Sequence, residues 1–355
     1  MLLDECHELW GASRIIEADP LTITASDIFY LPYAHGQAWG LFEQDGRIIE
    51  AAVDFRDVSK ETHGQLLLSP LRIDQIDDHA PPRRYVYGGH VNLHFGHFII
   101  NTLPRFWDMS RNMTADTKIL CHGIGSPELW FSIPFIARAF ALLGLSVRDF
   151  VSFDRPTRLD AVIVPGTSLE EQQAGYQAYG RLGRAIGARV LASSSVEQSD
   201  RPVYYSKANL KSAVGVIVNE REIEDVLASK GVDIVHPESL TLDDQIGLMA
   251  SRTSIMGSSG SFLHTSIFCQ NRNITCLNVT HNINSNFKII DDLAGNSSNY
   301  YFPRSIEVMD KADGFITVRH LPDARQVAVE LLDLMHAKAR REKRRRRWWP
   351  FGRKA

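Results

Sequence analysis

Hydrophobic and polar residues follow different patterns along the chain. Over residues 1–85 the apolar runs are short and are interrupted by Gly, Pro and Asp, which favours strands and turns over helices. Residues 97–111 have apolar positions at helical spacing, and Pro104 either kinks this helix or starts a second piece. Further helical patterns follow at 128–144 and 170–193. The first part of the chain is therefore predicted to begin β-rich and to continue as α/β.

A polar, Ser-rich stretch at residues 194–202 separates this part from a more regular one. Asn219 and Glu222 are expected to form a capping box at the start of a helix, and Thr241 to cap the next one. Strands that alternate with helices at this spacing form a parallel sheet with helices on both faces. The expected strands are 203–205, 232–235, 254–256 and 274–279, and the expected helices are 219–231, 241–251 and 262–268.

Length and composition limit the kind of protein this is. The chain has 355 residues, which is more than one hydrophobic core usually supports, so two domains are expected. Hydrophobic residues make up 44% and charged residues 23%, which excludes a disordered or fibrous chain. We expect an N-terminal domain at 1–195, a nucleotide-sugar-binding α/β domain at 196–322, and a C-terminal helix with a basic, aromatic tail at 323–355.

The start of the chain and the cysteines favour a cytoplasmic location. Residues 1–6 reach Asp and Glu at once, where a secretory signal would carry basic and then apolar residues. The four cysteines are scattered and form no close pair of the kind found in zinc sites or redox motifs. We expect reduced thiols, no membrane-spanning segment and a protein of the cytoplasm.

The C-terminal end differs in charge from the rest of the chain. The formal net charge is −3, yet nine of residues 340–355 are Lys or Arg, and Lys338 precedes them. Residues 348–351 are Trp-Trp-Pro-Phe, and aromatic rings prefer the headgroup region of a membrane. We expect this tail to bind the anionic inner face of the cell membrane. The alternative is a disordered tail that binds nucleic acid non-specifically, and no specific nucleic-acid partner is expected.

A loop of small residues follows the third strand of the second part and opens a helix. It consists of Gly257, Ser258, Ser259, Gly260 and Ser261. Backbone N–H groups and the positive end of a helix dipole meet at such a point, and glycines let the backbone approach an anion. This pattern favours a diphosphate site, and a flexible turn between strand and helix is the alternative.

Further candidate residues lie directly after strands of the same part. Ser206 and Lys207 follow the strand at 203–205 and would place a cation beside the loop. Glu238 follows the strand at 232–235 and is a candidate for accepting hydrogen bonds from ribose hydroxyls. A solvated lysine and a surface glutamate are the alternatives.

Three histidines lie close together in the first part, at positions 90, 94 and 97. A metal site is disfavoured because no Asp or Glu lies between His90 and Arg105. A histidine at the start of a helix, such as His97, can act as a base near neutral pH, since its ordinary pKa is about 6.5. A structural, hydrogen-bonded histidine is the alternative.

Several of these segments together resemble one family. Residues 97–105 read His-Phe-Ile-Ile-Asn-Thr-Leu-Pro-Arg and resemble the His-aromatic-aliphatic segment, ending in Leu-Pro-Arg, of glycosyltransferase family 61. This family includes bacterial capsular polysaccharide biosynthesis proteins. The resemblance extends over roughly residues 88–280. Further similar positions are Tyr204 to Lys207 for a Tyr-Ile-Ser-Arg strand, Asn219-Glu220, Pro237-Glu238 with Gln245, and Met256 to Phe268 for a glycine-rich loop and helix.

Four positions depart from the pattern of this family. Asn101 stands where many members carry an acidic residue. Lys207 replaces an arginine, which keeps the charge but loses a bidentate fork. Ser259 replaces a loop histidine, and Thr265 replaces an asparagine of the following helix.

The resemblance implies an α/β fold of the GT-B type, with two Rossmann-like domains facing a cleft. It also implies an inverting transfer of a sugar from a nucleotide diphosphate to a glycan or lipid-linked acceptor, in surface or capsular polysaccharide biosynthesis. No metal or other cofactor is expected, because a helix dipole and cations take the metal's place on the diphosphate. A nucleotide-sugar epimerase and a non-catalytic GT-B scaffold are the alternative functions.

Roles for individual residues follow from the same resemblance. His97 is the candidate base, and Asn101 belongs with it to the catalytic set. Arg105 is expected to orient substrate or to close the cleft through a carboxylate. The leaving diphosphate is expected to bind Lys207 and the N–H groups of the loop at 257–261.

Overall fold

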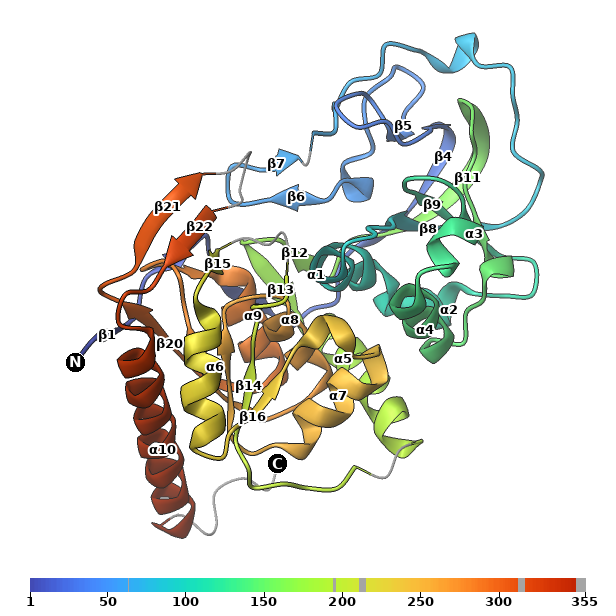
Figure 1. Ribbon diagram of the computed structural model, residues 1–355. Helices are drawn as coiled ribbons and strands as arrows, with labels where there is room; N and C mark the ends of the chain where they lie inside the picture. Colours follow the sequence, from blue (N-terminus) through green and yellow to red (C-terminus); the bar gives the residue numbers. More distant parts are fainter. Residues whose placement is uncertain (63, 194–195, 211–214, 312–316, 349–355) are drawn as a thin grey trace. The chain divides into compact units, whose positions relative to one another are not determined.

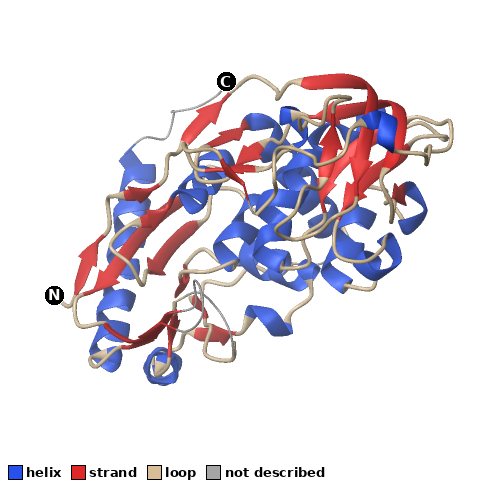
Figure 2. Ribbon diagram, turned by 90° about the horizontal axis from the view of Figure 1, so that it is seen from above, coloured by secondary structure: helices blue, strands red, loops and turns tan. Residues whose placement is uncertain are grey.

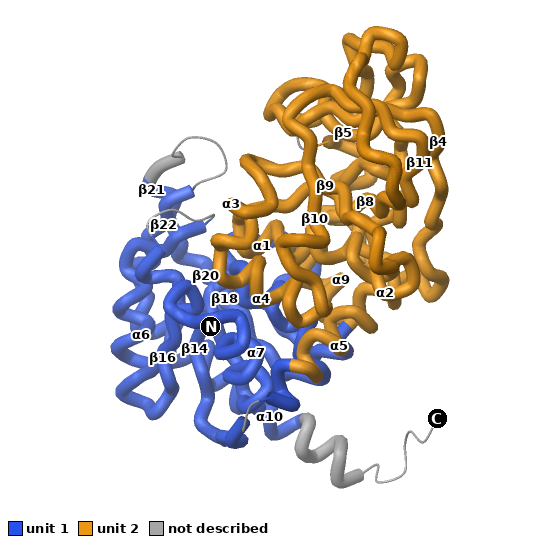
Figure 3. Tube along the Cα trace, turned by 90° about the vertical axis from the view of Figure 1, so that its right-hand side faces the viewer, with its two compact units in different colours: residues 1–9, 190–283, 294–355 blue, residues 10–189, 284–293 orange. Residues whose placement is uncertain are grey.

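The computed structural model describes residues 1–62, 64–193, 196–210, 215–311 and 317–348 (Figure 1). The chain is an α/β protein that contains both helices and strands (Figure 2). It forms two compact units, and each of them combines distant segments (Figure 3). Unit 1 contains residues 1–9, 190–283 and 294–355, and unit 2 contains residues 10–189 and 284–293. The domain boundaries expected at residues 195 and 322 stay predictions.

Within its described residues, unit 1 contains a six-stranded sheet in the order β1-β20-β18-β17-β14-β16. Five strands run parallel, and β1 at the edge pairs antiparallel with β20. The parallel sheet expected from the sequence is thus confirmed. The strands are β1 (Leu3–Glu5), β14 (Val203–Tyr205), β16 (Asp233–Val235), β17 (Ile255–Ser258), β18 (Asn273–Leu277) and β20 (Ser297–Pro303).

Helices cover both faces of this sheet. On one face, Ile223 of α6 and Leu331 of α10 belong to a buried cluster that also contains Tyr204 of β14. The next residue, Tyr205, points to the opposite face, where its ring stacks on Phe262 of α8 at 4.9 Å between centroids. The helices are α6 (Glu220–Ser229), α7 (Leu242–Ser251), α8 (Phe262–Thr265) and α10 (Ala324–Trp348), with single 3-10 turns at η6 (Pro237–Ser239) and η7 (Ser266–Phe268).

Short strands complete unit 1 and its boundaries. Among the described residues, β15 (Val216–Ile217), β22 (Thr317–His320) and β21 (Glu307–Lys311) form a three-stranded sheet in that order. Two further short strands lie where the chain passes from one unit to the other. They are β2 (Leu9–Trp10) and β19 (Ile283–Asn284).

Unit 2 contains a mixed sheet, with six strands among the residues described, in the order β10-β9-β8-β11-β4-β5. The first four run parallel, whereas β4 and β5 are added antiparallel. These strands are β4 (Thr22–Leu31), β5 (Gly40–Phe42), β8 (Tyr85–His90), β9 (Lys118–His122), β10 (Phe150–Val151) and β11 (Thr157–Pro165). Smaller strands are β3 (Arg14–Ile16), β6 (Phe55–Arg56), β7 (Glu61–Thr62), β12 (Leu169–Glu170) and β13 (Ala174–Tyr176).

The helices of unit 2 are mostly short, and the region after β8 consists of four consecutive pieces. These pieces are α1 (Phe95–His97), the π-helical η3 (Phe98–Thr102), the 3-10 helix η4 (Leu103–Asp108) and α2 (Met109–Asn112). Pro104 lies in the first turn of η4, so it starts a new piece, which is one of the two outcomes expected for it. The remaining helices are α3 (Pro127–Phe131), α4 (Pro134–Leu142), α5 (Gln177–Ala192) and α9 (Ser285–Ala294), with 3-10 turns η1 (Glu50–Ala52), η2 (Ile73–Gln75) and η5 (Val147–Asp149).

Three local expectations are wrong, each for a physical reason. The helix expected from residue 170 begins only at Gln177, because residues 169–176 form the β12–β13 hairpin. Asn219 makes no side-chain cap on α6, because its side chain bonds instead to the backbone N–H and C=O of Leu321 at 3.1 and 2.9 Å. Gly257 and Ser258 lie in strand β17 rather than in a loop, since they pair with β18.

Two other expectations, the cap at Thr241 and the C-terminal helix, are confirmed. Thr241 caps α7, since its hydroxyl accepts a hydrogen bond from the N–H of Asp244 at 3.1 Å. The helix expected from residue 323 is α10. Within the part of the chain that the structure describes, no helix is both long enough and apolar enough to cross a bilayer.

Candidate functional site

The first candidate cluster, in unit 2, is built around His97 at the end of α1. The turn that follows brings Asn101 back alongside it, and His97 Nδ1 lies 2.9 Å from Asn101 Oδ1. The His97 side chain is partly exposed, whereas that of Asn101 is buried. The structure therefore brings together two of the three residues expected in the catalytic set.

A buried carboxylate that the sequence did not reveal completes this cluster. Glu171 is only 3% exposed, and its Oε2 accepts a hydrogen bond from Asn101 Nδ2 at 3.1 Å. Its Oε1 lies 3.4 Å from Asn286 Nδ2 and 3.5 Å from Arg56 Nε. A buried charge needs such partners, because an uncompensated one costs several kcal/mol. Amide donors and a guanidinium thus hold the carboxylate in place.

The tip of the β12–β13 hairpin fixes the position of Glu171. Gln172, the next residue, has a φ of 58°, a left-handed conformation that is uncommon for a residue with a side chain. Its N–H donates to Asn286 Oδ1 at 2.6 Å, and its Oε1 accepts from Arg56 Nε at 3.0 Å. The sequence pattern of residues 170–176 gave no sign of a hairpin, and so Glu171 was missed.

Arg105 has different surroundings from those expected. Its side chain is fully buried, and the guanidinium donates to the carbonyl oxygens of Ala51 and Pro165 at 2.8 Å each. It also forms an ion pair with Asp54 at 2.5 Å. Gly89, at φ 77°, leaves room for it, because a Cβ there would lie 2.8 Å from Arg105 Cδ and Nε. These contacts tie together segments of unit 2 and favour a structural role for Arg105. The orienting role on substrate that the resemblance implies stays the alternative prediction.

His90 and His94, the other two histidines of the predicted group, each contact another ring. His90 stacks on Tyr33 with ring centroids 4.7 Å apart, and His94 lies 5.4 Å from His97 between ring centroids. Burial, with a smaller contribution from His97, lowers the pKa of His94. Among the described residues, no group of three or more His, Cys, Asp or Glu side chains is arranged to hold a metal ion.

The second candidate cluster lies in unit 1, where the order of the parallel strands reverses. β14, the first of these strands along the chain, lies between β16 and β17, the second and third. In sheets of this kind, ligands bind at the carboxyl ends of the strands beside such a reversal. Ser206 and Lys207 follow β14 at this point, and Ser259 and Gly260 follow β17.

Lys207 lies against the small-residue loop. A Cβ added at Gly260 would meet Lys207 Cδ at 3.2 Å, so the aliphatic stem passes directly over this glycine. Its Nζ donates to the carbonyl oxygen of Gly215 at 3.1 Å. Burial lowers the pKa of Lys207, and the nearby carboxylate of Glu220 acts in the opposite direction. The structure thus places this lysine beside the loop, as the sequence predicted.

Glu220, at the start of α6, is the centre of a buried polar network under the same point. It is fully buried and accepts hydrogen bonds from Tyr204 Oη at 2.9 Å and from Ser258 Oγ at 2.5 Å. Its second oxygen accepts from the backbone N–H of Lys207 at 3.3 Å. The hydroxyl of Ser206 donates to a second carboxylate, Glu224, at 2.6 Å. Ser206 and Ser258 therefore contact carboxylates of their own unit.

The loop itself is shorter than the sequence suggested. The N–H of Ser259 bonds to the carbonyl oxygen of Leu277 at 2.9 Å, continuing the pairing of β17 with β18. The helix that follows Ser261, α8, has only four residues. Glu238 is exposed on the 3-10 turn η6 after β16, where Gln245 Nε2 holds the carbonyl oxygen of Pro237 at 3.1 Å. Glu238 thus lies at the end of a neighbouring strand.

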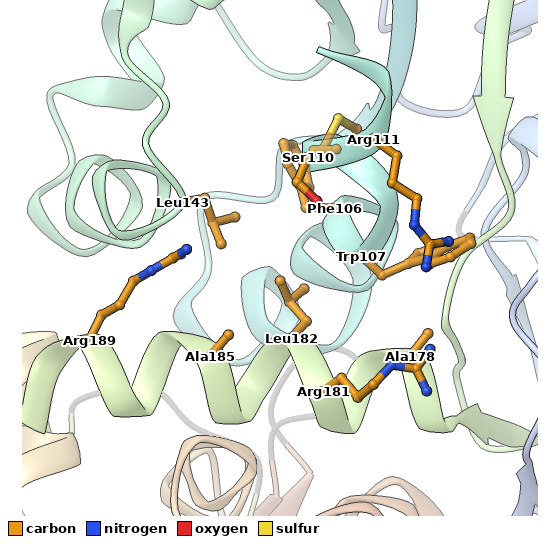
Figure 4. Close-up of a pocket in the computed structure, with 11 residues that line it drawn as sticks. Phe106, Trp107, Ser110, Arg111, Leu143, Ala178, Arg181, Leu182, Ala185 and Arg189 are labelled. Atoms are coloured by element: carbon orange, nitrogen blue, oxygen red, sulfur yellow. The ribbon is translucent and has the colours of Figure 1, made fainter.

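A cavity of about 210 Å³ in unit 2 involves other residues (Figure 4). Residues of α5 line one side, and the other lining residues are Phe106, Trp107, Met109, Ser110, Arg111 and Leu143. Arg111 and Arg181, at its rim, both pair with Asp19. Neither His97 nor any other predicted site residue lines this cavity.

The comparison with known proteins identifies the class to which this fold and these residues belong. Residues 95–277, just over half of the chain, match the family model described as Glycosyltransferase 61. The matched segment contains His97, Asn101 and Glu171 as well as Lys207 and the loop. The chain is thus a glycosyltransferase, and it belongs to glycosyltransferase family 61. Among curated proteins, none matches the chain significantly.

Proposed function

We propose that this glycosyltransferase moves a sugar from a nucleotide diphosphate to a hydroxyl of a glycan or lipid-linked acceptor, with inversion at the anomeric carbon. Surface or capsular polysaccharide biosynthesis is the setting that fits such a reaction. The observation that carries the proposal is the strand reversal of unit 1, where Lys207 lies over Gly260. A small-residue loop and a cation at that edge of a parallel sheet suit a diphosphate.

The nucleotide donor occupies this edge of the sheet in our proposal. The ammonium of Lys207 and the N–H groups at Gly260 and Ser261 would bind the diphosphate, and Glu238 would accept hydrogen bonds from the ribose. The network of Glu220 lies beneath them and bonds to the backbone of Lys207. It thereby supports the strand end from which the lysine projects.

His97 is the base in this proposal. Its ring is partly exposed, and its Nδ1 bonds to a buried amide, so Nε2 is the nitrogen that would approach an acceptor hydroxyl. The base takes the hydroxyl proton while the oxygen attacks the anomeric carbon. The bond to the diphosphate breaks with its electron pair, and cations stabilise the leaving group. A GT-B arrangement of the two units and independence from metal ions belong to the same proposal.

A location on the inner face of the cell membrane is proposed separately, from the basic C-terminal end of the chain. Residues 349–355 lie outside the described residues. Lys338 was expected to belong to the basic tail, but the structure gives it contacts within unit 1. Its Nζ donates to the carbonyl oxygens of Ile274 at 3.2 Å and of Ser297, so it holds α10 on the sheet. The membrane contact is therefore assigned to residues 342–355.

Co-sedimentation with vesicles tests the membrane proposal. The intact protein and a version that ends at Arg341 would be spun with vesicles of phosphatidylcholine containing phosphatidylglycerol. We expect the intact protein to pellet at low salt and the shortened one to remain in solution, since each basic residue near an anionic surface adds about 1 kcal/mol. Equal pelleting of the two forms would contradict the proposal.

Donor binding and turnover together test the proposed reaction. A thermal-shift screen with nucleoside diphosphates and their sugars first identifies the donor, because a ligand that binds the folded state raises its stability. His97→Ala should then leave donor affinity nearly unchanged and lower the rate of transfer by about 100- to 10,000-fold. His94→Ala is the matched control. Binding without transfer to any acceptor would favour the scaffold function, and a changed donor sugar without an acceptor would favour an epimerase.

A further inference from the structure

We propose that Glu171 is a positioning residue that fixes the tautomer of His97 through the side-chain amide of Asn101. The inference rests on the proposed function, since it concerns the base of that reaction. Asn101 bonds to both other side chains, to His97 through Oδ1 and to Glu171 through Nδ2. The buried carboxylate can therefore act on the histidine through this amide.

The carboxylate first determines the orientation of the Asn101 amide. An ionised carboxylate only accepts hydrogen bonds, whereas an amide has one accepting and one donating end. The end of Asn101 that faces Glu171 Oε2, at 3.1 Å, must therefore be the NH₂ group. The carbonyl oxygen then points to His97, and a flipped amide would set two acceptors against each other.

The amide orientation in turn determines which nitrogen of His97 carries the proton. Asn101 Oδ1 accepts only, so His97 Nδ1, 2.9 Å away, must donate and therefore carries a hydrogen. In the neutral imidazole the other nitrogen, Nε2, then has the lone pair. A base needs that lone pair at the nitrogen that meets the substrate. The buried hairpin thus determines the reactive face of a partly exposed ring.

The surroundings of Glu171 keep its charge in place. Arg56 Nε lies 3.5 Å from its Oε1, and Arg56 is itself held by Gln172 Oε1 at 3.0 Å. Asn286 Nδ2 lies 3.4 Å from the same carboxylate oxygen. With a cation and two amides around it, the carboxylate has donors on both oxygens. It is a rigid anchor for the amide rather than a flexible surface group.

The same arrangement favours the reaction. When the acceptor O–H bond breaks, the proton binds His97 Nε2 and the ring becomes a cation. The acceptor oxygen bonds to the anomeric carbon as the diphosphate leaves with the electron pair, and the proton later passes to solvent. The cation strengthens the bond from Nδ1–H to Asn101, and Glu171 lies one amide further away.

Glu171→Gln tests the inference because it keeps the shape of the side chain and supplies a donor. With Gln at 171, the Asn101 amide can flip, and both tautomers of His97 become possible. Glu170→Gln, the same change at the adjacent residue, is the matched control. Histidine ¹⁵N NMR of the intact protein, with the His97 signal assigned by its loss in His97→Gln, reports the tautomer without any substrate. We expect one Nδ1–H form in the parent and in the control, and a mixture in Glu171→Gln.

A second variant moves the carboxylate by one step along the same chain of hydrogen bonds. In N101D/E171Q, the carboxylate now at position 101 would accept from His97 Nδ1 and from the new amide at 171, so the order of donors and acceptors is restored. We expect Glu171→Gln to lower kcat at least ~10-fold with little change in KM for the donor, and N101D/E171Q to recover much of this loss. Asn101→Asp alone sets two carboxylates 3.1 Å apart and is expected to be the worst of the three.

The outcomes separate this inference from the proposed function. A single Nδ1–H tautomer in Glu171→Gln, or no recovery in a folded N101D/E171Q, would overturn the role of Glu171. If the parent protein transfers no sugar but the NMR result is as expected, the proposed reaction is wrong, whereas the effect of Glu171 on the tautomer of His97 is supported. If Glu171→Gln does not fold, N101D/E171Q decides by the same two measurements.

Discussion

Replacing Arg105 by methionine should destabilise unit 2 strongly and affect the reaction only through that loss. Methionine keeps much of the stem and removes the guanidinium. The side chain is fully buried, so the change leaves the Asp54 carboxylate without its cation and the carbonyl oxygens of Ala51 and Pro165 without their donors. Breaking a buried ion pair typically costs about 3–5 kcal/mol, and each unpaired buried acceptor about 1–3 kcal/mol.

Relaxation of the structure and entry of water make the total cost smaller than the sum of these separate costs. We therefore expect Arg105→Met to lower the free energy of unfolding by about 4 kcal/mol. Arg105→Lys keeps the positive charge but offers fewer hydrogen-bond donors than the guanidinium, and it should lower the free energy of unfolding by about half as much. Urea unfolding followed by tryptophan fluorescence measures both, because Trp39, Trp107 and Trp130 all lie in unit 2. Donor affinity should be unchanged in the folded fraction. A stable variant with abolished transfer would refute this reasoning and establish Arg105 as a substrate-orienting residue.

Three further predictions follow from buried groups. Lys207→Ala should weaken binding of the nucleotide diphosphate by about 1–3 kcal/mol in calorimetry, and unchanged affinity would exclude it from the donor site. Burial lowers the pKa of His122 to about 3, whereas an unfolded histidine has a pKa of about 6.5. As the pH falls from about 6.5 to 5, the unfolded chain therefore binds a proton that the folded chain does not, and the free energy of unfolding should drop by about 2 kcal/mol. His122→Gln should remove this drop in urea titrations at the two pH values. Gly89→Ala should lower the melting temperature more than Gly144→Ala. The two glycines have nearly equal φ values, 77° and 79°, but only a Cβ at residue 89 would meet Arg105. Equal effects of the two substitutions would contradict this contact.

The sequence predicted features that depend on neighbouring residues in the chain. The parallel strands of unit 1 follow from apolar runs that alternate with helices, and the Thr241 cap depends on a residue three positions away. Lys207 could be placed beside the loop because consecutive parallel strands end at one edge of a sheet. Here short-range patterns and the topology of the sheet agree.

Features that depend on distant residues could not be predicted in this way. Asn219 has the sequence of a helix cap, but its side chain bonds to Leu321, which lies 102 residues further along the chain. Glu171 lies in a segment with helical spacing, and its hairpin is fixed by Arg56 and Asn286, from two other regions. The burial of Arg105 depends on backbone carbonyls 54 and 60 residues away, which the pattern of residues 97–105 does not reveal. Tertiary contacts overrode local preference at each position.

The return of segment 284–293 to unit 2 has a consequence for how the protein is made. The ribosome completes residues 10–189 long before it reaches this segment, so the growing chain has no Asn286 to bond with Glu171 and no α9 to cover Gly175. Unit 2 can reach its final packing only after most of unit 1 has also been synthesised. A chain that stops before residue 284 therefore lacks part of both units, and the candidate base would lose a support of its anchoring carboxylate.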